Sequence, residues 1–206
     1  RSTVNLNDKA SPTVSSVTAT TANGSYNAGD AIAVTVVFSE VVAVTGTPQL
    51  TLETGSSDAV VNYTSGTGTT TLTFTYTIAS GHNSADLDYA STGALALNGG
   101  SIKDAAGNNA NLALVQPGAA NSLAANKALI VDTVTPTVTS VSSSTDNGSY
   151  RTGDVIAITI TFSENVFVNS DLFQNDGTGR PRLTLETGST DQGVNYSSGS
   201  GGATLT

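Results

Sequence analysis

The stretch that decides the fold is "NGSYNAGDAIAVTVVFSE" at residues 23–40, because the chain repeats it as "NGSYRTGDVIAITITFSE" at residues 147–164. Twelve of the eighteen positions are identical, across a separation of 124 residues. Self-similarity at a fixed spacing indicates a repeated structural unit. Solenoid repeats have only about 20 to 45 residues, whereas this unit has the length of a domain with its own core. We therefore expect copies of one domain joined in series.

The repeat continues on both sides of this stretch. The later matches lie 133 residues apart, because the second copy carries nine extra residues between Phe167 and Gly179. We predict a window from a longer array: residues 1–10 are the tail of a preceding repeat and a linker, residues 11–132 a complete repeat, and residues 133–206 a truncated second repeat. The further matches are "SPTVSSV" (11–17) with "TPTVTSV" (135–141), "LTLETGS" (50–56) with "LTLETGS" (183–189), and "VNYTSGTG" (61–68) with "VNYSSGSG" (194–201).

Alternation of apolar and small polar residues predicts strands in each copy. Side chains along a strand point to opposite faces in turn, so a run such as Ile32, Val34, Val36 indicates one buried face. Gly and Asn clusters supply the turns between the runs. Only "PGAANSLAANKA", at 117–128, leaves room for one short helical turn. We expect strands near residues 13–20, 31–38, 48–53, 59–64, 70–79 and 94–103, with a last strand that ends near residue 131.

The number of strands predicts the fold class. Seven to nine short strands in about 120 residues are typical of an antiparallel β-sandwich of immunoglobulin type. The chain lacks the disulfide and the core tryptophan of antibody domains, since it has no Cys and no Trp. We therefore predict an all-β protein of tandem immunoglobulin-like antiparallel β-sandwich domains.

Composition excludes several classes of function. The formal net charge of −9 repels the phosphates of nucleic acids. The absence of Cys excludes disulfides and thiol chemistry, and no apolar run approaches the roughly 18 residues of a membrane span. An acidic surface suits cations, and calcium prefers carboxylate oxygens. Solubility alone is the competing explanation for the acidity.

Acidic residues from distant positions are expected to converge at the domain boundaries. Glu40 follows the strand expected at 31–38, Asp104 lies in the turn-like "KDAAGN", and Asp8 lies in the linker. Like charges repel one another unless a cation or hydrogen bonds compensate. We therefore predict calcium at each boundary, with Asp132 and Glu164 as the corresponding ligands at the second boundary. Oxygen ligands without Cys favour calcium over zinc or copper.

A purely structural role for the same residues stays open. Asp104 can accept backbone N–H bonds within its own turn, and Asp30 follows Gly29 in another turn. A second acidic group is expected at the opposite end of the domain and consists of Asp30, Asp86 and Asp88. For this group too, both metal binding and a purely structural role stay open.

Five stretches, which together cover nearly the whole chain, carry a resemblance to a known family: "NGSYNAGDAIAVTVVFSE", "TPQLTLETG", "TTTLTFTYTIASGHNSADLDY", "LNGGSIKDAAGN" and "DTVTPTV". Together they resemble the tandem immunoglobulin-like repeats of giant bacterial cell-surface proteins and adhesins, including repeats of cyanobacterial swimming-associated surface proteins. It implies export, an extracellular location at the bacterial cell surface, β-sandwich modules and calcium at the linkers. The matching positions are Asp8, Asp132, Glu40, Glu164 and Asp104.

The expected function is therefore mechanical. We predict a structural extender of a giant adhesin, stiffened by calcium, with neighbouring repeats of the same polypeptide as partners. Host, biofilm or surface ligands would bind through other modules. We expect no enzyme, because His82 is the only histidine and no catalytic motif occurs. Two alternatives remain: a module that binds carbohydrate or protein through the loop at 167–180, and a self-assembling filament or surface-layer subunit.

The truncated second repeat raises a separate question. Half of a sandwich exposes an apolar face and unpaired strand edges. Either the remainder of the repeat lies outside this sequence, or another chain supplies the missing strands, as in donor-strand assembly.

Overall fold

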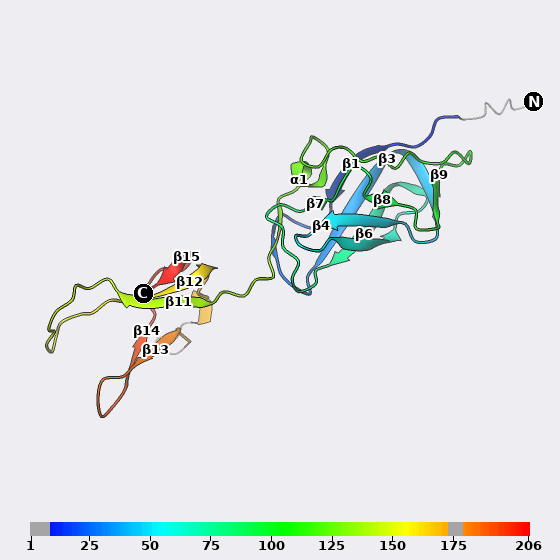
Figure 1. The fold of residues 1–206 in the computed structure, drawn as a ribbon. Coiled ribbons are helices and arrows are strands. Elements are labelled where there is room, and N and C mark those ends of the chain that lie inside the picture. Colours follow the sequence, from blue (N-terminus) through cyan, green and yellow to red (C-terminus); the bar gives the residue numbers. More distant parts are fainter. Residues whose placement is uncertain (1–8, 173–178) are drawn as a thin grey trace, which may run out of the picture. The chain divides into compact units, whose positions relative to one another are not determined.

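The computed structural model describes residues 9–172 and 179–206, and the protein is all-β with curled, largely antiparallel sheets (Figure 1). The chain forms two compact units, Arg1–Val134 (unit 1) and Thr135–Thr206 (unit 2). The prediction of an all-β chain is confirmed.

Unit 1 contains ten strands and one short helix within its described part. Most strands are short, and β3 is by far the longest. The elements are β1 (Val14–Ala19), β2 (Gly24–Tyr26), β3 (Ala31–Thr45), β4 (Gln49–Glu53), β5 (Ala59–Ser65), β6 (Thr69–Thr77), β7 (Asp88–Tyr89), β8 (Leu95–Ala96), β9 (Ser101–Lys103), α1 (Leu123–Asn126) and β10 (Leu129–Val131).

The main sheet of unit 1 is organised around β3. Its strand order is β1-β3-β6-β5-β4-β7, with β8 added to β4 and β9 added to β3, and every pairing in it is antiparallel. A separate parallel pair joins β2, in the first part of the unit, to β10, its last strand.

The buried face follows from the alternation in the sequence. Along β3 and β6 the inward residues are almost fully buried, while the intervening threonines are more exposed, apart from the buried Thr35. Burying a side chain of this size contributes roughly 1.5–3 kcal/mol. The largest fully buried side chains of unit 1 are Tyr89, Phe74, Ile32, Leu50, Leu52, Leu72, Leu87, Ile102, Leu123 and Leu129.

Two predicted strand boundaries are wrong. The strand expected at 31–38 continues to Thr45, because a register shift between Val37 and Val42 bends β3, so that it pairs first with β6 and then with β9. Glu40 therefore lies inside β3 and not in a loop beyond it. The strand expected at 94–103 is split into β8 and β9, because Asn98 and Gly99 adopt positive φ angles of 46° and 76° and form a turn.

The short helix α1 is held by a buried carboxylate. Asp88, in β7, is 7 % exposed, and it accepts hydrogen bonds from the amides of Tyr89 (2.9 Å), Gly118 (2.9 Å) and Leu123 (3.2 Å). Ser122 caps the helix by accepting a bond from the amide of Ala125 at 3.2 Å. Asp88 of the "DLDY" motif therefore anchors the segment that leads into α1.

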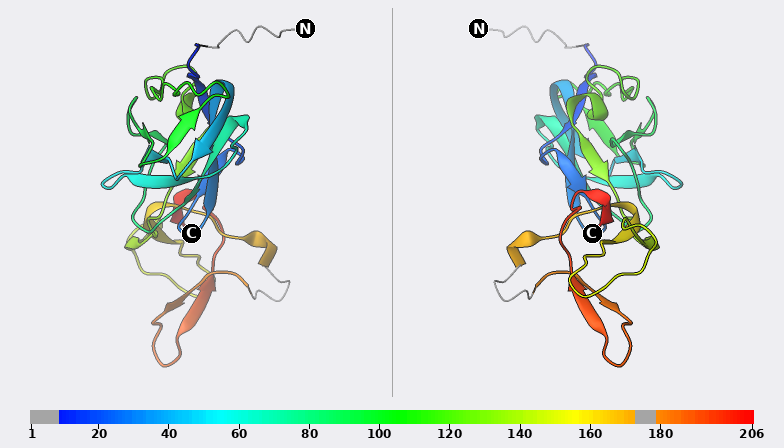
Figure 2. Two further views of the ribbon diagram at one scale, coloured as in Figure 1. Left: turned by 90° about the vertical axis from the view of Figure 1, so that its right-hand side faces the viewer. Right: turned by 90° about the vertical axis from the view of Figure 1, so that its left-hand side faces the viewer.

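Unit 2 repeats the first part of this pattern. Strands β11 (Val138–Ser143), β12 (Ile158–Val166) and β15 (Gly202–Leu205) form one sheet. Strands β13 (Arg182–Leu185) and β14 (Gln192–Asn195) form a hairpin, which Figures 1 and 2 show apart from that sheet, and the 3-10 turn η1 covers Ser170–Leu172. The register also recurs. Val138 lies opposite Phe162 as Val14 lies opposite Phe38, with a register shift after the first pair in both copies.

The repeated stretch builds the same turn twice. The carboxylate of Asp30 accepts a bond from the amide of Asn27 at 2.9 Å, and Asp154 accepts one from the amide of Arg151 at 3.0 Å. Because the donor is a backbone amide, the turn forms whether the residue that supplies it is Asn27 or Arg151. Three further hydrogen bonds recur in both copies. Oη of Tyr26 donates to the carbonyl of Ala22, as Oη of Tyr150 does to that of Asp146. The amide of Ala33 donates to Oγ1 of Thr21, as that of Ala157 does to Thr145, and the amide of Thr67 donates to Oη of Tyr63, as that of Ser200 does to Tyr196.

Candidate functional site

The chain that enters unit 1 is tied to the loop after β9. The side-chain amide of Asn108 donates to the carbonyl of Ala10 at 3.1 Å, and the amide of Asn111 donates to the carbonyl of Pro12 at 2.8 Å. Thr13 also exchanges bonds with Ser39 of β3, at 3.0 Å through its amide and 2.8 Å through its carbonyl. The described end of the incoming linker is therefore part of the folded unit.

Asp104 organises the loop that holds this linker. Its Oδ1 accepts from the amide of Asn108 at 2.8 Å, and its Oδ2 accepts from the side-chain amide of Asn108 at 2.6 Å. Burial alone would raise the pKa of Asp104. Hydrogen bonds from the side chain and amide of Asn108 and from the amides of Gly107 and Ala106 outweigh this effect and lower the pKa below 3.8. Asp104 thus holds Asn108 in the position from which it binds Ala10.

The predicted metal ligands of the first boundary are only partly described. Asp8 lies outside the described residues. Glu40 is partly exposed within β3, and Asp104 accepts the bonds of its own loop. Across residues 9–172 and 179–206, no three His, Cys, Asp or Glu side chains lie close enough together to hold a metal ion.

The chain that leaves unit 1 is held by a second loop, residues 80–83. The hydroxyl of Thr133 accepts from the amide of Gly81 at 2.9 Å and donates to the carbonyl of His82 at 3.0 Å. The amide of Thr133 donates to Oδ1 of Asn83 at 3.0 Å. We call this set of bonds between Thr133 and residues 81–83 the exit clasp. It makes the first residue after Asp132 part of unit 1.

Aromatic packing supports the loop of the exit clasp. Tyr76, in β6, is 2 % exposed, and its hydroxyl bonds Nδ1 of His82 at 2.8 Å. The two rings are stacked, with centroids 5.9 Å apart and planes at 24°. Burial raises the pKa of Tyr76 to about 12. His82 is thus a packed structural residue.

The two predicted ligands of the second boundary have different surroundings. Oδ1 of Asp132 accepts a bond from the amide of Val134 at 3.0 Å, which shapes the linker locally. Glu164, in β12, has a buried Oε1 with no hydrogen-bond partner among the described residues. A buried carboxylate oxygen without a donor is costly, so Glu164 is the one predicted ligand within the described part of the chain that has an unpartnered buried oxygen.

Sequence reasoning missed the residues of the exit clasp. Thr133, Gly81 and Asn83 are small polar or glycine residues in a chain rich in them, and no periodicity marks them. The loop sequence "SGHNS" signals a turn, but its partner lies 50 residues further along the chain, and only the fold brings the two together.

The comparisons with known proteins name no relative for this chain. No family model, no curated protein and no solved structure matches it. In the described part of the chain, no helix has the length and apolar character that crossing a bilayer requires.

Proposed function

We propose that this chain is a segment of tandem immunoglobulin-like β-sandwich repeats that serves as a structural extender of a giant bacterial cell-surface adhesin. Its role is to hold a distal binding module away from the cell. The partners of each repeat are the neighbouring repeats of the same polypeptide, and the location is extracellular.

The observation that carries this proposal is the exit clasp. A spacer transmits orientation and force from one domain to the next, and this requires that the linker be anchored to the domains it joins. Thr133 makes three hydrogen bonds with the loop of residues 81–83, and Asn108 binds the carbonyl of Ala10 at the incoming end. Both ends of unit 1 thus have an anchored linker. The recurrence of the β1–β3 register in β11–β12 supports a modular array.

The immunoglobulin-like assignment is supported by the pairing of unit 1. Antiparallel neighbours joined in the order β1-β3-β6-β5-β4, together with a parallel contact between β2 and the last strand, β10, fit a sandwich of that type.

Calcium at the linkers is a further part of the proposal. The buried Oε1 of Glu164 supports it, since a cation would compensate this oxygen. Asp104 gives weaker support, because donors of its own loop already surround its carboxylate. When bound, calcium would supply positive charge to the carboxylates and stiffen the linker that they flank.

Single-molecule stretching tests the spacer role. The chain is pulled from its two ends, and we expect unit 1 to unfold in one cooperative event that releases about 400 Å of chain, as the length of an extended polypeptide requires. A glycan array probed with the same chain should give no binding. Gradual extension without a force peak, or saturable binding of one glycan class, would contradict the spacer role and favour an adhesive module.

Calcium dependence is tested separately, by calorimetry of the full chain in millimolar calcium and in excess EDTA. We expect a higher melting temperature with calcium, and Glu164→Gln should reduce the shift. Identical melting curves in the two buffers would remove calcium from the proposal and leave the clasp as the means of anchoring the linker.

A further inference from the structure

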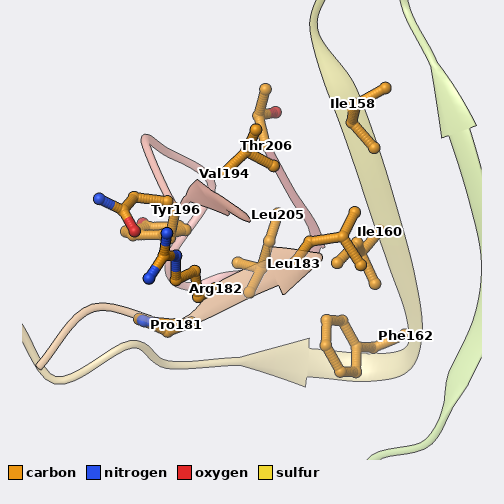
Figure 3. A pocket seen from close by; sticks show the side chains of 11 residues that line it. Ile158, Ile160, Phe162, Pro181, Arg182, Leu183, Val194, Tyr196, Leu205 and Thr206 are labelled. Carbon is orange, nitrogen blue, oxygen red and sulfur yellow. The ribbon is translucent and has the colours of Figure 1, made fainter. Parts of the chain in front are cut away.

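Unit 2 presents an open apolar face. A hollow of about 120 Å³ lies between the β11-β12-β15 sheet and the β13–β14 hairpin, and apolar side chains from both converge on it (Figure 3). Leu205, at 8 % exposed, is the one buried hydrophobic residue among the described residues of unit 2. The apolar side chains that carry the argument are Ile158, Ile160, Phe162, Leu183, Val194 and Leu205.

Each of these residues has a counterpart in unit 1 at the matching position of the repeat. The counterparts are identical or differ by one methylene, and all are between 0 % and 5 % exposed. Unit 1 thus shows the same face with its cover in place. In the same order, the counterparts are Val34, Val36, Phe38, Leu50, Val61 and Leu72.

The cover in unit 1 comes from the second half of the repeat. In unit 1, residues between Phe74 and Val131 share one hydrophobic core with the counterparts of the open face. Among them Tyr89, Leu87 and Leu129 are at most 1 % exposed, so they lie deep in that core. The effect of the cover is visible in matched residues. Val17 is 0 % exposed in unit 1, and its counterpart Val141 is 56 % exposed in unit 2.

The backbone of unit 2 has open edges at the matching places. In unit 1, Ala31–Thr35 of β3 pairs with Thr73–Thr77 of β6. In unit 2, residues 155–157, which correspond to Ala31–Ala33, are not in a strand, and the ladder of β12 with β15 ends at the pair Ile160 and Leu205. Likewise β2 pairs with β10 in unit 1, whereas its counterpart at 148–150 forms no strand.

From these matches we infer that the open face of unit 2 is a docking surface for one kind of segment, the second half of a repeat with the pattern of residues Phe74–Val131. Such a segment brings a strand for the edge at 155–159, a parallel strand for 148–150, and inward apolar side chains for the hollow. The face differs from its covered counterpart by only two methylenes, at Ile158 and Ile160, so the same cover fits. This inference does not depend on the spacer role or on calcium.

A second copy of this chain is a poorer occupant. To donate its own residues 74–131 it would have to open unit 1, where these residues form the core. Face-to-face contact of two copies of unit 2 would bury apolar surface but would leave without partners the edges that β6 and β10 satisfy in unit 1.

Fragment complementation tests the inference. A peptide of residues 73–131 is added in trans to the isotopically labelled full chain, and in a second arm the same sequence is fused after Thr206. In at least one arm we expect shifted NMR signals for Ile158, Ile160 and Leu205, new slowly exchanging amides at 155–159, and a cooperative unfolding transition of unit 2.

Two substitutions in β12 serve as the test and its matched control. Ile160→Asp should abolish the complementation, whereas Asn165→Asp, at an exposed position of β12 whose counterpart Val41 is 52 % exposed in unit 1, should retain it. The transition of unit 1 reports in both variants that the chain still folds. The inference fails if neither arm changes unit 2, if Ile160→Asp responds like the unaltered chain, or if the chain alone dimerises through Ile158 and Ile160.

Discussion

The backbone amide of Thr133 donates a hydrogen bond to Oδ1 of Asn83 at 3.0 Å, across 50 residues of sequence. Its side-chain hydroxyl bridges the amide of Gly81 and the carbonyl of His82 in the same loop. The direction in which the chain leaves unit 1 is therefore set by the unit itself, before the linker begins.

The first prediction concerns the hydroxyl of the exit clasp. Thr133→Val keeps the shape of the side chain and removes two hydrogen bonds, each worth about 1 kcal/mol. We expect faster hydrogen exchange at the amide of Gly81 and larger backbone motion at residues 132–134 by ¹⁵N relaxation. Thr135→Val, at an exposed position of the linker, is the control. Unchanged exchange at Gly81 would show that the hydroxyl does not hold the exit.

The second prediction compares two glycines of one turn. Gly66 has φ +114°, and a Cβ there would lie 2.0 Å from the carbonyl oxygen of Thr71. Gly68 has φ +78°, with open space around its Cβ position. Gly66→Ala should cost about 3 kcal/mol or more, through overlap and strain. Gly68→Ala should cost about 1 kcal/mol, through its backbone conformation. Urea unfolding of unit 1 measures both, and equal losses would contradict the close approach.

The third prediction uses the repeat as its own control. Val17→Ala removes two methyl groups from a residue that is 0 % exposed, so it should destabilise unit 1 by about 2 kcal/mol. Val141→Ala makes the same change at the matching position of unit 2, which is 56 % exposed, and should cost under about 0.5 kcal/mol. Chemical denaturation followed by NMR signals of each unit measures the two values. Similar losses would mean that the burial of Val141 equals that of Val17.

The fourth prediction concerns alkaline pH. Burial raises the pKa of Tyr76 to about 12, and burial with the charge of Asp88 raises that of Tyr89 to about 12, from 10.0. The unfolded chain therefore loses these protons first. The stabilisation is complete below pH 10 and is lost as the pH rises toward 12. The unfolding free energy of the unaltered chain should fall more steeply over this range than that of the double variant Tyr76→Phe with Tyr89→Phe. Parallel curves would contradict the raised pKa values.

The fifth prediction concerns acid. The pKa of Asp104 is lowered below 3.8, so its stabilising effect is present above that value and is lost as the pH falls below it. Asp104→Asn should destabilise unit 1 at neutral pH and flatten its acid unfolding curve below pH 4. The exposed Asp58→Asn is the matched control. If Asp104→Asn leaves the hydrogen-exchange rate of the Asn111 amide unchanged, the structure of the loop does not depend on the carboxylate.

Part of the fold follows from local pattern alone. The alternation through Ile32, Val34 and Val36 predicts β3 and its buried face, because the two-residue period of a strand needs no distant information. The predicted strand lengths are wrong where tertiary contacts extend or divide a strand. β3 continues through Glu40 because its second half pairs with β9, whose residues lie 56 to 60 positions further along the chain.

The candidate site was predictable only in outline. The linker carboxylates are visible in the sequence, which leaves either a metal-binding or a turn role possible for Asp104. In the structure its oxygens accept bonds from Asn108. The clasp residues Thr133 and Asn83 carry no such signal, because threonine and asparagine are common throughout the chain and their bond depends on the path of the backbone between them.

By itself, the sequence determined that the chain consists of repeated β units with one apolar face each, because strand periodicity and turn-forming glycines act over a few residues. Only the tertiary structure decided how the linker is anchored and how the second half of unit 1 covers its apolar face. Those outcomes depend on contacts between segments 50 or more residues apart, where identical local sequences such as 50–56 and 183–189 meet different surroundings.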